Sequence, residues 1–280
     1  MTRPGANPVP PEPSRRGRPR GFNSEPGQTT IQALDRALEV MQLLAAHEGL
    51  SLSEIARALG QSVATMHRVL ATLEAREFAE LSAERQEWHV GPAAFRVGSA
   101  FLRRSNLLSR SRGTMHGLMQ ATGETSNLGV EWKGSVLFVS QVETHEVIRA
   151  FFPPGTVSPL HASGIGKALL AGWDAARLDS FLGTADLARF TVKTLTAPDR
   201  LRDDLGRSRA QGYAVDDEER TEGMRCVAAA IRDVHGEAVA GISVSGPTSR
   251  MSDMRIAEIG AAVRTAADEV SRRIGAPLRS

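Results

Sequence analysis

Apolar residues recur every three or four positions near the start of the chain, which is the spacing of a helix that buries one face. Five of them form a stripe on the first predicted helix: Ile31, Leu34, Leu38, Met41 and Leu44. Thr29 or Thr30 can cap the N-terminus of this helix, and Gly49 marks its end. The pattern therefore predicts that the folded part of the chain begins with a helix.

Two shorter helices are predicted to follow, with a tight turn between them. Ser51 and Glu54 have the spacing of a capping box, so we expect the second helix to begin there and to end at Gly60. Ser62 can cap a third helix. The residues expected on the buried face of this third helix are Val63, Met66, Leu70 and Leu73. Two short helices joined by a turn at Gly60 and Gln61 are typical of a helix-turn-helix.

The third helix carries small and hydrogen-bonding side chains over its N-terminal half. The candidate DNA contacts are Ser62, Ala64, Thr65, His67 and Arg68 at this helix, and Arg36 on the first. In a recognition helix, small residues allow close approach to the major groove, and polar residues reach the edges of the bases. This part of the sequence therefore predicts binding to double-stranded DNA.

A short hairpin is predicted directly after the third helix. Residues 78–82 and 87–90 read as two strands around the polar turn 83–86, which is the arrangement of a wing. Arg85 and Gln86 are expected at the tip, where they can touch the DNA backbone or minor groove. A winged helix used for contacts with protein is the alternative interpretation.

An amphipathic helix is predicted at residues 92–103, after a break at Gly91-Pro92. Its apolar residues are Phe95, Val97, Phe101 and Leu102. Such a helix is either a dimer contact or a linker packed on its own chain. A homodimer or homotetramer suits a DNA reader, because two recognition helices can then occupy two half-sites on one duplex.

Helix and strand patterns alternate from residue 107 onward. The predicted helices are 107–122, 164–172, 174–181, 197–211 and 252–274, and the predicted strands are 126–132, 136–143, 147–152, 226–232 and 238–245. Turns at Lys133-Gly134 and His235-Gly236 join four of these strands into two hairpins. Hairpins separated by groups of helices predict an α+β domain.

The first 28 residues differ in composition from the rest, being rich in Pro, Gly and Arg with little to bury, so we expect disorder. Arg16, Arg18 and Arg20 lie in a short segment that resembles an AT-hook, which places arginines in a narrow minor groove. A solvated basic tail is the alternative. The predicted organisation is a basic arm at 1–28, a winged helix-turn-helix at 29–91, a linker helix at 92–106 and an α+β domain at 107–280.

Composition excludes several classes of protein. The 280 residues carry a formal net charge of +2, so the total charge does not by itself indicate a nucleic-acid partner. One cysteine, Cys226, excludes an internal disulfide framework and fits a reducing cytoplasm. No apolar run is long enough for a bilayer span, and the N-terminus lacks the apolar core of a secretory signal, so no membrane partner is expected.

An enzyme is an alternative class of protein. Cys226 with His161 or His235, or Ser163 with His161, can in principle supply a nucleophile and a base. However, the chain has no Gly-x-Ser-x-Gly elbow and no residues at zinc-ligand spacing. We therefore expect no catalytic residue, no metal and no cofactor.

Four segments in a fixed order, 33–45, 52–78, 159–171 and 212–247, resemble the IclR family of bacterial transcriptional regulators. The resemblance extends from about Ile31 to Ile274 and leaves out the basic arm. It implies an N-terminal winged helix, a C-terminal effector-binding domain with a GAF-like sheet, and dimers or tetramers. The expected function is control of a metabolic operon in response to a ligand.

The resemblance also implies where the ligand binds. In members that sense small 2-oxo acids, backbone amides hold the carboxylate, here those of Gly164 and Ile165. The polar contacts would come from Asp216, Cys226, Ser243 and Ser245, and the apolar wall from Met224, Val147 and Ala150. Independently, a Gly-containing turn that opens a helix offers free N–H groups and a partial positive charge to an anion. Ser243 and Ser245 alternate along one predicted strand and so share a face.

Each of these residues also has a structural interpretation. The glycine turn can serve packing, Cys226 can be a small buried hydrophobe, the two serines can be inward-facing small residues, and Asp216 can lie in a solvated acidic loop. Ala150 and Ser158 are smaller than the apolar residues expected there, so the size of the pocket is open. Glyoxylate, then pyruvate, is the predicted effector. A larger or aromatic acid would need a roomier cavity, and a DNA-binding protein without a ligand is a further alternative.

Overall fold

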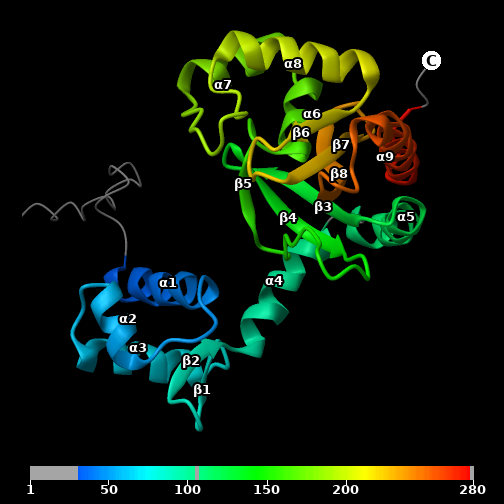
Figure 1. Cartoon of the computed structure of the whole chain (residues 1–280). Helices are drawn as coiled ribbons and strands as arrows, with labels where there is room; N and C mark the ends of the chain where they lie inside the picture. The colour runs from blue at the N-terminus through cyan, green and yellow to red at the C-terminus, as the bar shows by residue number, and fades with distance from the viewer. Residues whose placement is uncertain (1–30, 105–106, 278–280) are drawn as a thin grey trace, which may run out of the picture. The chain divides into compact units, whose positions relative to one another are not determined.

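The computed structural model describes residues 31–104 and 107–277 (Figure 1). The chain divides into two compact units between Gly98 and Ser99. The predicted basic arm, with Arg16, Arg18 and Arg20, lies outside the described residues, and so do Thr29 and Thr30. Phe101 and Leu102 lie outside the residues whose side chains are described.

The first unit has the predicted helices and hairpin. Its elements are α1 (Gln32–Ala45), α2 (Leu52–Ala58), α3 (Val63–Glu74), β1 (Ala79–Ser82), β2 (Glu87–Val90) and the start of α4 (Pro92–Arg104). The capping box forms as predicted: the Glu54 amide donates to Ser51 Oγ, and the Ser51 amide donates to Glu54 Oε2 at 2.8 Å. The core of this unit consists of Val40, Leu44, Ile55, Ala56, Met66, Leu70, Ala79 and Trp88.

The predicted stripe on α1 is wrong in its first half. Ile31, Leu34 and Leu38 are exposed, whereas Val40 and Leu44 are buried. The cause is that α1 packs on α3 and β2, and its buried residues all lie in its C-terminal half. Val63, predicted on the inner face of α3, is likewise exposed, while Met66 and Leu70 are buried.

The first helix also ends earlier than predicted. It stops at Ala45, and Gly49 instead passes close to the hairpin, where a β-carbon would lie 2.6 Å from His89 Cε1. Leu50 and Trp88 exchange main-chain hydrogen bonds of 3.2 and 2.7 Å. The segment after α1 thus pairs with the wing instead of continuing the helix.

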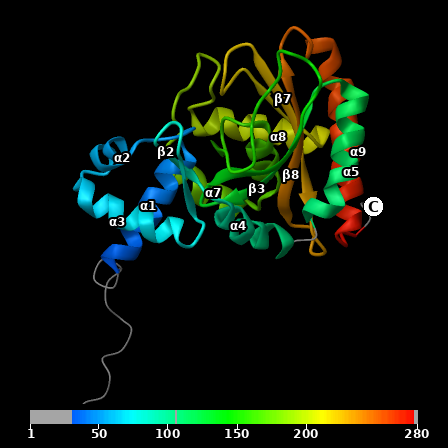
Figure 2. The same ribbon diagram turned by 90° about the horizontal axis from the view of Figure 1, so that it is seen from below.

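The second unit is a six-stranded antiparallel sheet with helices on both faces (Figures 1 and 2). The strands follow the order β5-β4-β3-β8-β7-β6. Their bounds are β3 (Thr125–Trp132), β4 (Ser135–Val142), β5 (Val157–Pro159), β6 (Ala214–Asp217), β7 (Met224–Arg232) and β8 (Ala238–Pro247). The helices are α5 (Leu107–Thr122), α6 (Gly164–Gly172), α7 (Ala175–Thr184), α8 (Pro198–Gln211) and α9 (Asp253–Arg273).

One strand was predicted wrongly and two were missed. Residues 147–152 form no strand, because the segment crosses from β4 to β5 with Val147, Ile148 and Phe151 exposed. The short edge strand β5 was not predicted. Neither was β6, whose Asp216 and Asp217 suggest a loop although Asp216 is buried in the sheet.

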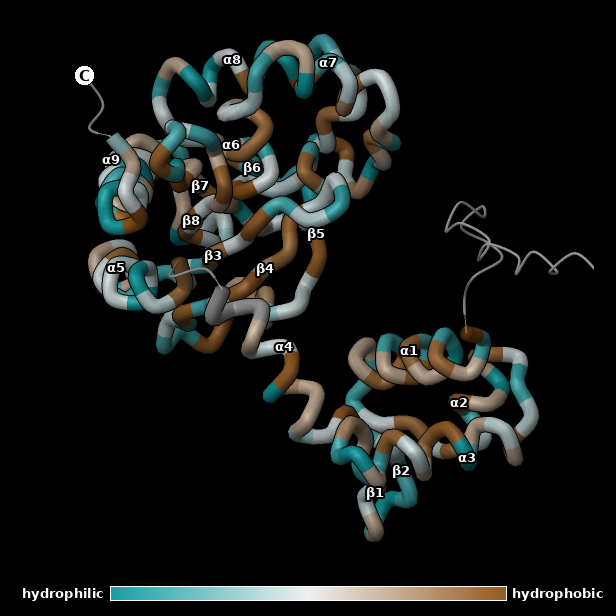
Figure 3. Tube along the Cα trace, turned by 180° about the vertical axis from the view of Figure 1, so that it is seen from behind, coloured by the Kyte–Doolittle hydropathy of each residue, from teal (hydrophilic) through white to brown (hydrophobic). Residues whose placement is uncertain are grey.

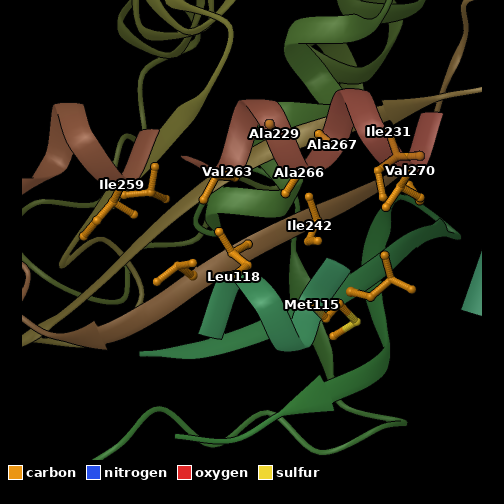
Figure 4. Packing of buried hydrophobic residues seen from close by; sticks show 14 of the residues in the cluster. Met115, Leu118, Ala229, Ile231, Ile242, Ile259, Val263, Ala266, Ala267 and Val270 are labelled. Atoms are coloured by element: carbon orange, nitrogen blue, oxygen red, sulfur yellow. The ribbon is translucent and has the colours of Figure 1, made fainter. Parts of the chain in front are cut away.

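Two hydrophobic layers enclose the sheet. On one face, Met115 and Leu118 of α5 and Val263 and Val270 of α9 pack against Ile242 of β8 (Figure 4). Hydrophilic and hydrophobic residues alternate along both α5 and α9 (Figure 3). On the other face, α6 is buried from end to end, with the sheet on one side and α8 on the other. The sheet and α6 together position the candidate ligand site.

Candidate DNA-binding surface and effector site

The N-terminal half of α3 is held by its cap. Ser62 Oγ accepts a hydrogen bond from the Thr65 amide at 3.1 Å and lies 2.8 Å from Thr65 Oγ1. Ala64, His67 and Arg68 are exposed, and Thr65 is half-buried. The predicted recognition residues therefore share one accessible face, although both hydroxyls already take part in the cap.

A groove of about 650 Å³ runs between α1 and α3. Arg36 from α1 lines it together with Thr65, His67 and Arg68 from α3. The fold thus brings Arg36 next to the predicted recognition residues. Two arginines and a histidine around one groove provide hydrogen-bond donors suited to phosphates and guanine edges.

The wing turn separates the roles of its two candidate residues. Gln86 has a left-handed backbone conformation with φ of 55°, and its Nε2 donates to the Ala83 carbonyl at 3.0 Å. Its side chain therefore closes the turn. The prediction that it extends from the tip toward DNA is wrong. Arg85 is exposed beside it.

The second site is a polar cluster on the α6 face of the sheet. Asp216, Cys226 and Ser245 lie opposite one another on β6, β7 and β8, so their side chains share this face. Ser243 lies two residues along β8 and joins them. The fold therefore brings together all four polar residues that the resemblance implies.

The N-terminus of α6 contacts this cluster directly. Ser163 caps the helix by accepting a hydrogen bond from the Gly166 amide at 3.1 Å. A β-carbon on Gly164 would lie 2.7 Å from Cys226 Sγ, so only glycine permits this approach. Ile165 is buried, with its side chain against Gly241 and Gly129 of the central strands. The partial positive charge of the helix end thus faces the polar residues.

Burial governs the charge of Asp216. Desolvation raises the pKa of this carboxyl to about 6, against the opposing effect of the Lys167 charge and of the Glu219 and Arg220 amides. The Glu219 amide donates to Asp216 Oδ1 at 2.8 Å. Asp216 therefore lies buried in strand β6, so the alternative of a solvated acidic loop is wrong.

Cys226 is a neutral thiol at physiological pH. Burial raises its pKa to about 11 and the Asp216 charge adds to this effect, while hydrogen bonds from Ser245, Ser243 and the Gly164 amide oppose it. An un-ionised thiol is a weak nucleophile. The arrangement accordingly favours a binding role for Cys226.

The predicted apolar wall is only partly brought together. Val147 is 91% exposed and belongs to the crossing segment, so its placement at the site is wrong. Ala150 is buried, although in no strand, and its carbonyl accepts a hydrogen bond from Gln141 Nε2 at 3.4 Å. Met224 begins β7 and shares the face of Cys226.

Two groups of residues at this site were missed from the sequence. Asn127 and Gln141, from β3 and β4, make hydrogen bonds that reach Ser243 and Ser245. Lys167 is completely buried in α6, with Nζ 2.5 Å from Glu219 Oε1 and 2.9 Å from Asp204 Oδ2. The available signal was a lysine inside the otherwise apolar stretch 164–171.

The buried ion group carries more carboxyls than cations. Burial alone would lower the pKa of Lys167, but the charges of Glu219 and Asp204 outweigh it and raise that pKa. Burial raises the pKa of Glu219 to about 7, despite the attraction of Lys167. Lys167 therefore stays protonated, while Glu219 gains a proton close to neutral pH.

Within residues 31–104 and 107–277, no helix combines the length and apolar character needed to cross a lipid bilayer. The described part of the chain also contains no group of three or more His, Cys, Asp or Glu side chains arranged to hold a metal ion.

Three helices, a wing and an exposed α3 face define the first unit as a winged helix-turn-helix, a class of DNA-binding domain. Residues 33–82 match the family model described as the IclR helix-turn-helix domain. Residues 99–272 match the model of the bacterial transcriptional regulator IclR C-terminal region. The chain therefore belongs to the IclR family of DNA-binding transcriptional regulators, which confirms the resemblance found in the sequence.

Individual relatives span nearly the whole chain. The HTH-type transcriptional regulator BhcR of Paracoccus denitrificans is 56% identical over 260 residues, covering 92% of this chain and 93% of its own. The crystal structure of the Thermotoga maritima IclR has a TM-score of 0.76 at 29% identity, covering 88% of this chain and all of its own. The IclR homolog of Microbacterium hydrocarbonoxydans complexed with 4-hydroxybenzoate has a TM-score of 0.75 at 23% identity, covering 86% and 98% of the two chains. The relatives named as regulators agree with the prediction that this chain is not an enzyme.

Proposed function

We propose that this regulator changes its affinity for DNA when a small carboxylate binds the polar cluster beneath α6, with glyoxylate as the first candidate and pyruvate as the second. The observation that carries the proposal is the contact between the α6 N-terminus and Cys226, beside Ser243 and Ser245. A helix N-terminus and two hydroxyl groups can donate hydrogen bonds to an anion, although none of them carries a full positive charge.

The close packing of α6 favours a small acid. Gly164 lies against Cys226, and Ile165 fills the space over Gly129 and Gly241, so the helix runs close to the sheet. A two- or three-carbon acid matches this spacing and the short polar side chains around it. Met224 and Ala150 would supply the apolar contacts.

A larger or aromatic acid is the second candidate effector. Two observations favour it: the small side chain of Ala150 and the 4-hydroxybenzoate complex of the Microbacterium protein. Such a ligand would need α6 or the segment before β5 to move away from the sheet. A regulator without any effector is the remaining alternative.

For the DNA side, we propose that the exposed face of α3 enters the major groove. Ala64 would allow close approach, Thr65, His67 and Arg68 would reach base edges, and Arg36 would contact a phosphate from the neighbouring wall of the groove. Arg85 of the wing, and the arginines of the arm, would contact flanking DNA. A homodimer or homotetramer would place these faces on successive half-sites.

Fluorescence anisotropy tests both sites together. A labelled duplex from upstream of the protein's own gene is titrated with the full chain at fixed salt, with and without glyoxylate or pyruvate. We expect nanomolar to micromolar DNA binding that changes with one of the two acids. The coupling between ligand and DNA is typically about 1–3 kcal/mol, which is roughly a 5- to 150-fold change in affinity.

The outcomes separate the alternatives. DNA binding that ignores both acids but responds to 4-hydroxybenzoate would replace the small effector with an aromatic one. Binding that responds to none of the three, with no change in thermal unfolding of the full chain, would favour a regulator without an effector. Acetamide, a small neutral amide, serves as the control compound.

A further inference from the structure

Two side-chain amides form a chain of hydrogen bonds behind the serines of the effector site. Gln141 on β4 lies opposite Asn127 on β3, and Asn127 lies opposite Ser243 on β8. Gln141 Nε2 donates to Asn127 Oδ1 at 3.1 Å. Asn127 Nδ2 donates to Ser245 Oγ at 3.2 Å and to Ser243 Oγ at 3.5 Å. The amides therefore connect three strands to both hydroxyls.

A main-chain carbonyl sets the direction of this chain. Gln141 Nε2 also lies 3.4 Å from the carbonyl oxygen of Ala150, which can only accept a hydrogen bond. The Gln141 amino group consequently faces both Ala150 and Asn127, and the Asn127 amide must turn its oxygen to Gln141 and its amino group to the serines. Each serine hydroxyl is thus engaged as an acceptor.

A hydroxyl that accepts from Asn127 still has its own proton to donate. Without a ligand, the neighbouring acceptor is Cys226 Sγ, because Cys226 lies opposite Ser245 and shares this face of the sheet with Ser243. Asn127 and Ser243 are completely buried, and Ser245 is 2% exposed. A reversal of direction would leave a buried polar group without a partner, which costs about 1–3 kcal/mol. Burial therefore fixes the hydroxyls as donors.

We propose that Gln141 and Asn127 are positioning residues that hold Ser243 and Ser245 as hydrogen-bond donors, so that the site selects an anionic ligand over its neutral amide. This proposal rests on the proposed function, which places a carboxylate at these serines. Apolar residues would hold the three strands together equally well. The chain of hydrogen bonds through Gln141 and Asn127 has one direction, and this direction turns the two serine hydroxyls into donors. That effect explains why polar residues are present in the centre of the sheet.

The decisive variant is Gln141→Glu. A carboxylate at this position can only accept, so Asn127 must turn its amino group toward it and its oxygen toward the serines. Both hydroxyls would then donate to Asn127 and be lost to the ligand. Gln141 is half-buried, which makes this change easier to accommodate than Asn127→Asp.

Two control variants separate the direction of the hydrogen-bond chain from two other effects of the substitution: the added negative charge and the loss of the Gln141 amide. Ser140→Glu places the same charge on the neighbouring residue of β4, which faces the other side of the sheet. Gln141→Met removes the amide without adding a charge. In that variant Asn127 can adopt either orientation, so about half of the molecules keep the donor arrangement and affinity for the acid falls about twofold.

The first measurement needs no effector. The chain has one cysteine, so the pH dependence of its alkylation by iodoacetamide in the full-length protein reports the pKa of Cys226 alone. We expect Gln141→Glu to raise this pKa clearly above that of Ser140→Glu, because both hydroxyl donors leave Sγ. An equal pKa in these two variants would overturn the proposal, whatever the effector.

The second measurement compares pyruvate with neutral pyruvamide by calorimetry on the same proteins. Gln141→Glu is expected to reduce the affinity for pyruvate about tenfold more than the affinity for pyruvamide, since hydrogen bonds to a charged group are the stronger ones. Equal losses for both compounds would indicate a purely structural role and overturn the proposal. If the wild-type protein binds neither compound, the proposed function fails, while the alkylation result still decides the direction of the chain. If Gln141→Glu does not fold, Gln141→Met takes its place. Unchanged affinity for pyruvate and an unchanged pKa of the Cys226 thiol in that variant would overturn the proposal.

Discussion

Gly164 and Cys226 are in direct contact, and the contact leaves no room for a side chain on the helix. A β-carbon on Gly164 would lie 2.7 Å from Cys226 Sγ, 3.1 Å from the Cys226 carbonyl oxygen and 3.3 Å from Ala228 Cβ. The first residue of α6 is thus packed directly against Cys226 and Ala228 of β7. The pair of Gly164 and Cys226 sets the distance between helix and sheet at the candidate effector site.

Gly164→Ala is therefore expected to destabilise the second unit by about 1–3 kcal/mol, the usual cost of overpacking. Urea unfolding of the full chain measures the change. Gly206→Ala is the matched control, because this glycine lies in α8 with open space around its Cα, and alanine there is expected to stabilise by up to about 1 kcal/mol. Equal stability of Gly164→Ala and wild type would show that α6 can move away from the sheet without cost.

Arg68 provides the test of the recognition face. Arg68→Ala removes an exposed guanidinium at the α1–α3 groove and should weaken DNA binding by about 1–3 kcal/mol, if it makes a bidentate base contact, with no change in thermal unfolding. Arg76→Ala removes the same charge from an exposed position after α3 and serves as the control. Equal losses in the two variants, measured by anisotropy at fixed salt, would reduce the role of Arg68 to general charge.

Binding of the acid should depend on pH through Asp216. Burial raises its pKa to about 6, so at pH 8 the carboxylate opposes a second anion, and below pH 6 it is neutral. Affinity for glyoxylate or pyruvate is expected to rise as pH falls from 8 to 6, by at most about tenfold per unit for one proton taken up. Asp216→Asn resembles the protonated form, so its affinity should be higher at pH 8 and nearly independent of pH. A steep pH dependence that persists in this variant would assign the proton to another group.

Stability without ligand should also fall as pH rises, because of Glu219. Its pKa is about 7 in the folded protein, with burial as the main cause, against an ordinary value of 4.5 for a glutamate carboxyl. The folded state therefore binds the proton more tightly, and the free energy of unfolding decreases between about pH 4.5 and 7, by up to about 3 kcal/mol for this group. Glu219→Gln should flatten that slope. A slope that rises with pH in the wild-type protein would mean that Lys167 holds Glu219 ionised.

The sequence predicted the local elements well where the signal lies within a few residues. Ser51 and Glu54 form the expected capping box, and the turns at Gly134 and Gly236 have the positive φ that their hairpins require. The misplaced features depend on what packs against them. Ile31 and Leu34 are apolar but exposed, because α1 meets the core only through its last turns, and Val147 lies in a crossing segment with the composition of a strand.

At the candidate effector site, too, the residues found from the sequence are those that a local or family pattern marks. Cys226, Ser243 and Ser245 were found because a family pattern marks them. Asn127 and Gln141 were missed, since their role depends on the register of β3 with β4 and β8, which brings residues more than 100 positions apart into contact. Lys167 was missed because a charge inside an apolar stretch has no visible partner until α8 and the turn after β6 are in place.

The outermost strands of the sheet are its shortest. β5 has three residues, one of them Pro159 without an N–H group, and β6 has four, ending at Asp217, which pairs with Lys193 and Arg225. Edges of this kind offer few main-chain groups to a strand from another molecule. Copies of the protein that gather on one stretch of DNA can therefore crowd together without joining edge to edge, and the sheet is protected from growing into fibrils.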